Sequence, residues 1–153
     1  MLIPFGVACG ESTEPPAENA QERQALLTSV TDNVILPAYQ RLADTTASLA
    51  TAAQAYANAA QNGEGQVELG AVQTAFTEAY AAMQYAEVLQ IGPYGPASKF
   101  EAGQNVRDEV YSWPIVNACR VDQEIVSEDF AEEDFFEDSL VNVYGFDALE
   151  YLL

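Results

Sequence analysis

The chain has 153 residues, of which 49% are hydrophobic, so it is long and apolar enough for one domain with a real core. Its 24 acids against 5 bases give a net charge of −19 at pH 7, which argues against charge-driven binding to nucleic acid or to anionic membranes. The absence of histidine excludes a Ser/His/Asp catalytic set.

Residues 1–19 are interpreted as a truncated lipoprotein-type signal and a linker. An apolar run ends in Gly-Val-Ala at Cys9 and is followed by a stretch rich in Glu, Ser, Thr and Pro. This pattern is similar to the end of a bacterial lipoprotein signal, in which Cys9 would carry the lipid. Cys119 would then lack a partner and form a buried thiol. The alternatives are an ordinary chain terminus and a Cys9–Cys119 disulfide.

Residues 20–153 are predicted to form an all-α domain of the up-down bundle type, built on a long antiparallel helix pair with shorter helices. Helical spacing runs from about residue 20 to 62 and again from 67 to 91, with a turn at 63–66. Pro37 lies inside the first pattern and should kink that helix or split it. The first stripe contains Leu27, Val30, Val34, Ala38, Leu42, Leu49, Ala53 and Tyr56, and the second contains Leu69, Val72, Phe76, Ala79, Met83 and Ala86.

A loop at 92–103 is followed by two predicted short helices. The first covers residues 106–113, includes Trp113 and breaks at Pro114, because proline cannot continue a helix. The second covers residues 118–126, with Asn117 as its N-cap.

Arg107 and Arg120 are two of only five bases, so in this acidic chain they are expected to pair with carboxylates. Asp122 and Glu124 lie close to Arg120 in sequence and are its candidate partners. The alternative is a surface salt bridge of small energetic value.

Residues 124–138 hold eight acids interleaved with Phe130, Phe135 and Phe136. Such a run is typical of a solvated face, and the phenylalanines predict that it still packs on the core. No calcium loop, zinc spacing or phosphate loop is present in the sequence.

Residues 144–153 read as a turn at Gly145 followed by a helix. Phe146, Leu149, Leu152 and Leu153 would form its apolar face, and Asp147 and Glu150 would lie side by side on the other face. This pair is either a cation site or simply two acids near a helix N-terminus, where the helix dipole favours them. Because the chain stops within the apolar run, we expect a fragment.

Four segments resemble the imelysin-like family of bacterial envelope proteins. They are Asn33-Val-Ile-Leu-Pro-Ala-Tyr-Gln-Arg-Leu, residues 80–93, Val110-Tyr-Ser-Trp-Pro with Asn117-Ala-Cys-Arg-Val-Asp-Gln, and Gly145-Phe-Asp-Ala-Leu-Glu. The last is similar to the family's Gly-x-His-x-x-Glu motif. The resemblance covers about the first half of a typical member. It implies two bundle-like halves, export to the periplasm or outer membrane, often as a lipoprotein, and a link to iron uptake.

The chain departs from that motif, because Asp147 stands where the family has histidine. Some family members have been described as metallopeptidases, but an Asp147/Glu150 pair suits a harder cation, such as calcium or ferric iron. The expected function is therefore non-catalytic binding of a metal ion or an iron-linked ligand, with other envelope proteins as further partners and membrane contact only through a lipid anchor. The alternatives are a metallopeptidase completed by a missing second half, and a structural bundle that binds a partner protein. Residues expected to support the motif are Gly145, Trp113, Pro114, Cys119, Arg120 and Asp122.

Overall fold

The computed structural model describes residues 18–111 and 117–153. In those two ranges every regular element is a helix and none is a strand, which confirms the all-α prediction. The α-helices are α1 (Glu18–Val30), α2 (Leu36–Ala60), α3 (Gln66–Glu87), α4 (Ala118–Ser127), α5 (Phe135–Asp138) and α6 (Phe146–Leu152). A π-helical turn, η1 (Thr31–Ile35), joins α1 to α2, and the 3-10 turns are η2 (Gly92–Tyr94), η3 (Val106–Glu109), η4 (Asp129–Ala131) and η5 (Val141–Val143).

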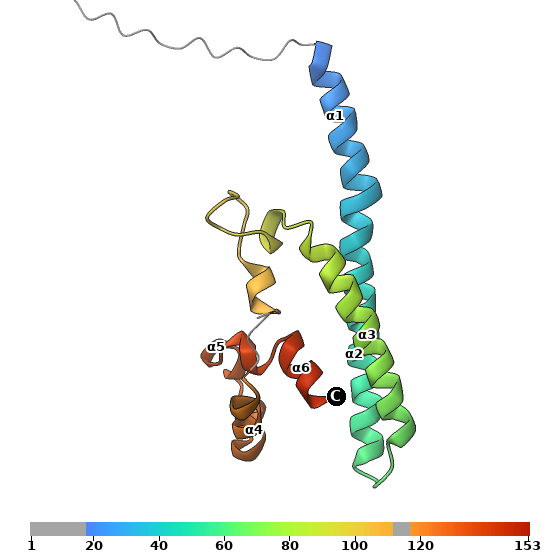
Figure 1. Ribbon diagram of the computed structural model, residues 1–153, viewed down its shortest axis with the longest axis vertical. Helices are drawn as coiled ribbons and strands as arrows, with labels where there is room; N and C mark the ends of the chain where they lie inside the picture. The colour runs from blue at the N-terminus through green and yellow to red at the C-terminus, as the bar shows by residue number, and fades with distance from the viewer. Residues whose placement is uncertain (1–17, 112–116) are drawn as a thin grey trace, which may run out of the picture.

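The α1, η1 and α2 segments follow one another as a single long rod (Figure 1). Pro37 neither splits nor ends this rod. Instead, the backbone widens into the π-helical turn, whose Leu36 N–H donates to the Thr31 carbonyl, five residues back. Pro37 then falls in the first turn of α2, where a missing N–H costs no hydrogen bond.

The predicted antiparallel hairpin is confirmed by α2 and α3, which form the most extensive contact between elements (Figure 1). Leu49 of α2 packs against Val72, Phe76 and Ala79 of α3. The chain reverses at a turn containing Gly65, whose φ is 121°, an angle that favours glycine. α3 ends at Glu87, earlier than the predicted residue 91, and the 3-10 turn η2 follows.

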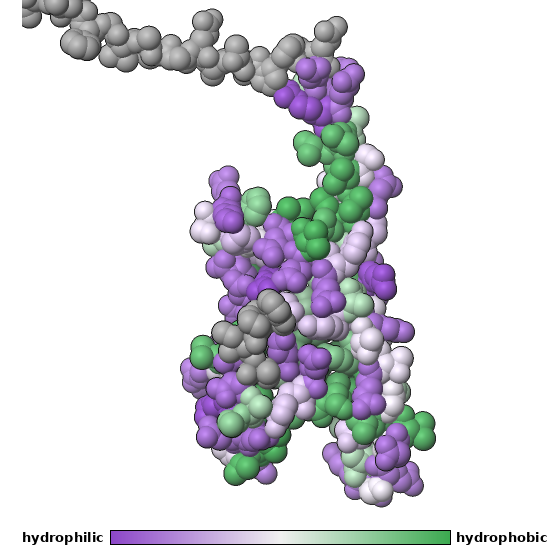
Figure 2. Space-filling view, in the orientation of Figure 1, coloured by the Kyte–Doolittle hydropathy of each residue, from purple (hydrophilic) through white to green (hydrophobic). Residues whose placement is uncertain are grey.

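The N-terminal part of the first predicted stripe is exposed, so that part of the core prediction is wrong. Leu27 is 67% exposed, and Val30 and Val34 are also exposed. The reason is tertiary: α3 lies beside α2 but not beside α1, whose main contact is with η1. Figure 2 shows the resulting apolar surface on the upper part of the rod.

The remaining helices are short and build a second apolar cluster of Val121, Phe135, Val143 and Ala148. α6 connects the two clusters. Its Ala148 belongs to the second, whereas Phe146, Leu149 and Leu153 pack against the hairpin. Leu152 is 52% exposed and does not join the predicted apolar face.

Two predictions for the loop-rich region need correction. The helix predicted at 106–113 is only the 3-10 turn η3, and it ends at Glu109. The acidic run is not uniformly solvated, because Glu124 and Phe135 are buried while Phe130 and Phe136 are exposed. The other short helix is confirmed as α4, and its Asn117 side chain accepts a hydrogen bond from the Arg120 N–H.

Among the described residues, no helix has the length and apolar character needed to cross a membrane.

Candidate functional site

The motif helix α6 begins at a close contact between three chain segments. The Phe146 N–H donates to the Val110 carbonyl (3.0 Å), and the Gly145 N–H donates to the Val141 carbonyl (2.8 Å). A Cβ at Gly145 would lie 2.9 Å from each of those two carbonyl oxygens. Glycine is therefore required here by the lack of space, and not by the backbone angle that the sequence suggested, because φ is −73°.

The two motif acids differ in their surroundings. Asp147 is 7% exposed, whereas Glu150 is exposed. The prediction that both acids lie on an outer face is wrong for Asp147, because its side chain is buried whereas that of Glu150 is not. The family resemblance implies a bound metal ion, which would need several ligating side chains close together. No group of three or more His, Cys, Asp or Glu side chains suited to a metal ion occurs among residues 18–111 and 117–153. The two carboxylates do not fit a complete metal centre on their own, since hard cations take six or more oxygen ligands.

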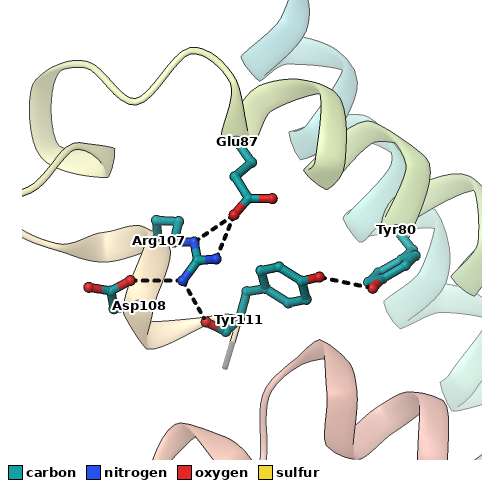
Figure 3. A network of polar contacts seen from close by, with 5 residues as sticks. All are labelled: Tyr80, Glu87, Arg107, Asp108 and Tyr111. Carbon is teal, nitrogen blue, oxygen red and sulfur yellow. Dashed lines mark hydrogen bonds and ion pairs between the residues drawn. The ribbon is translucent and has the colours of Figure 1, made fainter. Parts of the chain in front are cut away.

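Arg107 lies at the centre of a polar network near α6 (Figure 3). Its Nη2 is 2.5 Å from Glu87 Oε1, and its Nε donates to the same oxygen at 3.0 Å. Its Nη1 donates to Asp108 Oδ1 at 3.0 Å and to the Tyr111 carbonyl at 3.3 Å. This confirms that Arg107 pairs with carboxylates, and its ion pair with Glu87 ties the end of α3 to η3.

Two tyrosines extend this network towards the motif helix (Figure 3). The hydroxyls of Tyr80 and Tyr111 are 3.1 Å apart and share a hydrogen bond. Burial raises the pKa of Tyr111, and the hydrogen bond to Tyr80 and the negative charges of Asp147 and Glu87 raise it further. The Tyr111 phenol therefore stays protonated at neutral pH and acts as a hydrogen-bonding group rather than as a base.

The predicted supporting residues on α4 are only partly brought together. Arg120 pairs with Glu124, at 2.7 Å between Nη2 and Oε1, while Asp122 accepts a hydrogen bond from the Tyr151 hydroxyl of α6 instead. Cys119 is exposed, which corrects the expected buried thiol. It precedes Val121, a buried residue of α4, by two positions, and a helix turns about 100° per residue, so the two side chains point in nearly opposite directions.

Three predicted residues lie outside the described ranges, namely Cys9, Trp113 and Pro114. Conversely, sequence reasoning missed Glu87, Tyr80 and Tyr111. The scarcity of bases indicated that Arg107 would find an acid, but nothing local in the sequence indicates which one, because Glu87 lies 20 residues away.

A comparison with models of protein families identifies the family to which this chain belongs. The model described as imelysin matches residues 35–153, which include the hairpin, the Arg107 network and the motif helix. The chain belongs to the imelysin family. The match begins at η1, so α1 lies outside it. A search of curated proteins found no match to this imelysin-family chain, and a search of solved structures found none either.

Proposed function

We propose that this imelysin-family chain is a non-catalytic binding protein of the bacterial cell envelope. In this proposal it contributes to iron uptake by holding a cation or an iron-linked ligand at the motif helix. The supporting observation is the arrangement of acids on α6, where the buried Asp147 and the exposed Glu150 lie three residues apart. Two negative charges one helical turn apart, in a molecule with a net charge of −19, favour an approaching cation.

Asp147 and Glu150 would supply only part of the coordination shell. The other oxygen ligands would come from water, from the ligand itself or from residues beyond those that the structure describes. This arrangement suits calcium or ferric iron better than it suits a softer metal, because the available donors are carboxylates.

Binding is favoured over peptide hydrolysis by the chemistry of the donor set. A hydrolytic metal centre needs about three protein ligands and a base that activates the bound water. The chain contains no imidazole, and the Tyr111 phenol beside the motif is protonated at neutral pH.

Thermal melting tests the binding proposal. Calcium or ferric citrate should raise the melting temperature of the wild type, and this shift should be much smaller in Glu150→Gln, because one ligand oxygen is lost. Glu150 is exposed, so this variant should fold normally. Glu133→Gln removes the same charge from another exposed position and is the matched control. Equal metal-induced shifts in all three proteins would contradict the proposal, and metal-dependent cleavage of a peptide would favour the peptidase alternative.

The proposed location is the periplasm or outer membrane, with Cys9 lipid-anchored, supported by Gly-Val-Ala-Cys followed by a polar stretch. Labelled palmitate should enter the wild-type protein and Cys119→Ser, but not Cys9→Ser. Label that persists in Cys9→Ser would contradict the anchor at Cys9.

A further inference from the structure

A cleft of about 340 Å³ lies between the hairpin and the short helices. Its lining residues come from α2, η3, α5, α6 and the residues next to η3 and α6, and are Leu49, Glu109, Val110, Phe136, Tyr144, Gly145, Phe146 and Leu149. The volume falls in the range of small-molecule sites. Asp147 and Glu150 do not line it, so it is separate from the motif carboxylates.

Aromatic rings form one wall of this cleft. The rings of Phe136 and Tyr144 cross at 83° with their centroids 5.3 Å apart, and Phe135 packs behind both. Phe136 is nevertheless 67% exposed. The faces of aromatic rings carry partial negative charge and attract cations within about 6 Å. The wall therefore suits a ligand with both apolar and positively charged parts.

Among the lining residues that the structure describes, Glu109 is the only charged one, and none is basic. The Tyr144 hydroxyl donates to Glu109 Oε2 at 3.4 Å, which is a long hydrogen bond. An ionised carboxylate offers about four acceptor positions, so most of them stay available to a ligand. Arg107, two residues before Glu109, is held by Glu87 and Asp108.

We propose that this cleft binds a small organic cation that carries an ammonium group on an apolar stem. The ammonium group pairs with Glu109 and lies against the ring faces of Phe136 and Tyr144. The stem lies against the aliphatic side chains, which are those of Leu49, Val110 and Leu149. A bare metal ion gains nothing from the apolar walls, and an anion is repelled by Glu109 and by the net charge of −19. This ligand class goes beyond the function proposed above and uses different residues.

Isothermal titration of the full chain in an amine-free buffer of low ionic strength tests the proposal. The probes are 2-phenylethylammonium, the neutral 2-phenylethanol and the anionic 3-phenylpropionate. The ammonium probe should bind saturably and about tenfold more tightly than the alcohol, as expected for one charge-assisted contact. The carboxylate probe should not bind. Absence of saturable ammonium binding, or equal affinity for the alcohol, would overturn the proposal.

Three variants distinguish binding in the cleft from general attraction of the ammonium probe to the negatively charged protein. Glu109→Gln should weaken ammonium binding about tenfold and leave binding of the alcohol unchanged. Phe136→Leu keeps an apolar side chain but removes the ring face, and should weaken ammonium binding about threefold. Glu137→Gln changes the net charge equally at an exposed neighbour outside the cleft, and should behave as wild type. Equal losses in Glu109→Gln and Glu137→Gln would show that only the overall charge matters and would overturn the site.

Glu150→Gln should bind the ammonium probe normally, so this proposal and the cation proposal can fail separately.

Discussion

Gly145 is the residue where a single added methyl group should disturb the candidate site most. In Gly145→Ala the new Cβ would lie 2.9 Å from two backbone oxygens, which cannot move without shifting the start of α6. We expect a loss of about 1–3 kcal/mol in the free energy of unfolding, measured by urea denaturation. Gly70→Ala is the matched control, because an added Cβ there meets nothing within 4 Å in an exposed helical position. It should be neutral or stabilise by up to about 1 kcal/mol, and equal losses in both variants would contradict the steric argument.

Arg107 should be intolerant even of lysine. Its guanidinium contacts Glu87, Asp108 and the Tyr111 carbonyl at the same time, and it lies 4.9 Å from the centre of the Tyr111 ring. A lysine ammonium cannot reproduce this planar fork, so Arg107→Lys should cost about 1–3 kcal/mol of stability in urea denaturation. Arg41→Lys, at an exposed position of α2, should stay within about 0.5 kcal/mol of wild type. A comparable loss in Arg41→Lys would show that the network itself is not responsible.

Tyr94 gives a prediction about alkaline pH. Burial raises its pKa to about 12, with the charge of Glu87 as a second cause. Because its pKa is higher in the folded protein than the ordinary value of about 10, ionisation of this tyrosine does not affect stability below pH 10 and lowers the stability of the fold as the pH rises from about 10 towards 12. Between about pH 9 and about pH 12, the melting temperature of Tyr94→Phe should therefore fall less than that of the wild type.

At neutral pH the same variant should not be harmful. The buried Tyr94 hydroxyl has no hydrogen-bond partner among the described residues, so removing it leaves no group newly unpaired. Tyr94→Phe should be neutral or more stable by up to about 1 kcal/mol in thermal melting. A clear destabilisation would indicate that the hydroxyl is held by a contact that the structure does not show.

In the long rod formed by α1, η1 and α2, the same apolar pattern is buried in one helix and exposed in another, so its residues contribute differently to stability. Leu49 of α2 is 7% exposed in the hairpin core, while Leu27 of α1 is 67% exposed. Leu49→Ala should cost about 2–5 kcal/mol, because it leaves a cavity beside Phe76. Leu27→Ala should stay within about 0.5 kcal/mol, since alanine also favours helix. Urea denaturation measures both, and a large loss in Leu27→Ala would show that another surface covers α1 in solution.

At the scale of the whole molecule, the net charge of −19 should dominate the response to salt. Like charges repel one another in the compact fold, and added salt screens that repulsion over about 10 Å at 0.1 M. We expect the melting temperature to rise with sodium chloride, in contrast to a protein held together by surface ion pairs. A fall in melting temperature would mean that pairs such as Arg107–Glu87 contribute more than the repulsion removes.

The sequence by itself determined the all-α class, the α2–α3 hairpin and the N-cap of α4, because helical spacing, glycine turns and capping residues act over a few neighbouring residues. It also indicated that Arg107 and Arg120 would be paired, since bases are scarce in the chain. The tertiary structure alone decided which face of each helix is covered. Leu27 follows the same pattern as Leu49, but in the described part of the chain α3 packs beside α2 and not beside α1. Asp147 is covered although Glu150, one turn away, is not. Contacts between segments far apart in the chain, such as Tyr80 with Tyr111 and Glu109 with Tyr144, leave no periodic signal, because their spacing depends on how the whole chain packs.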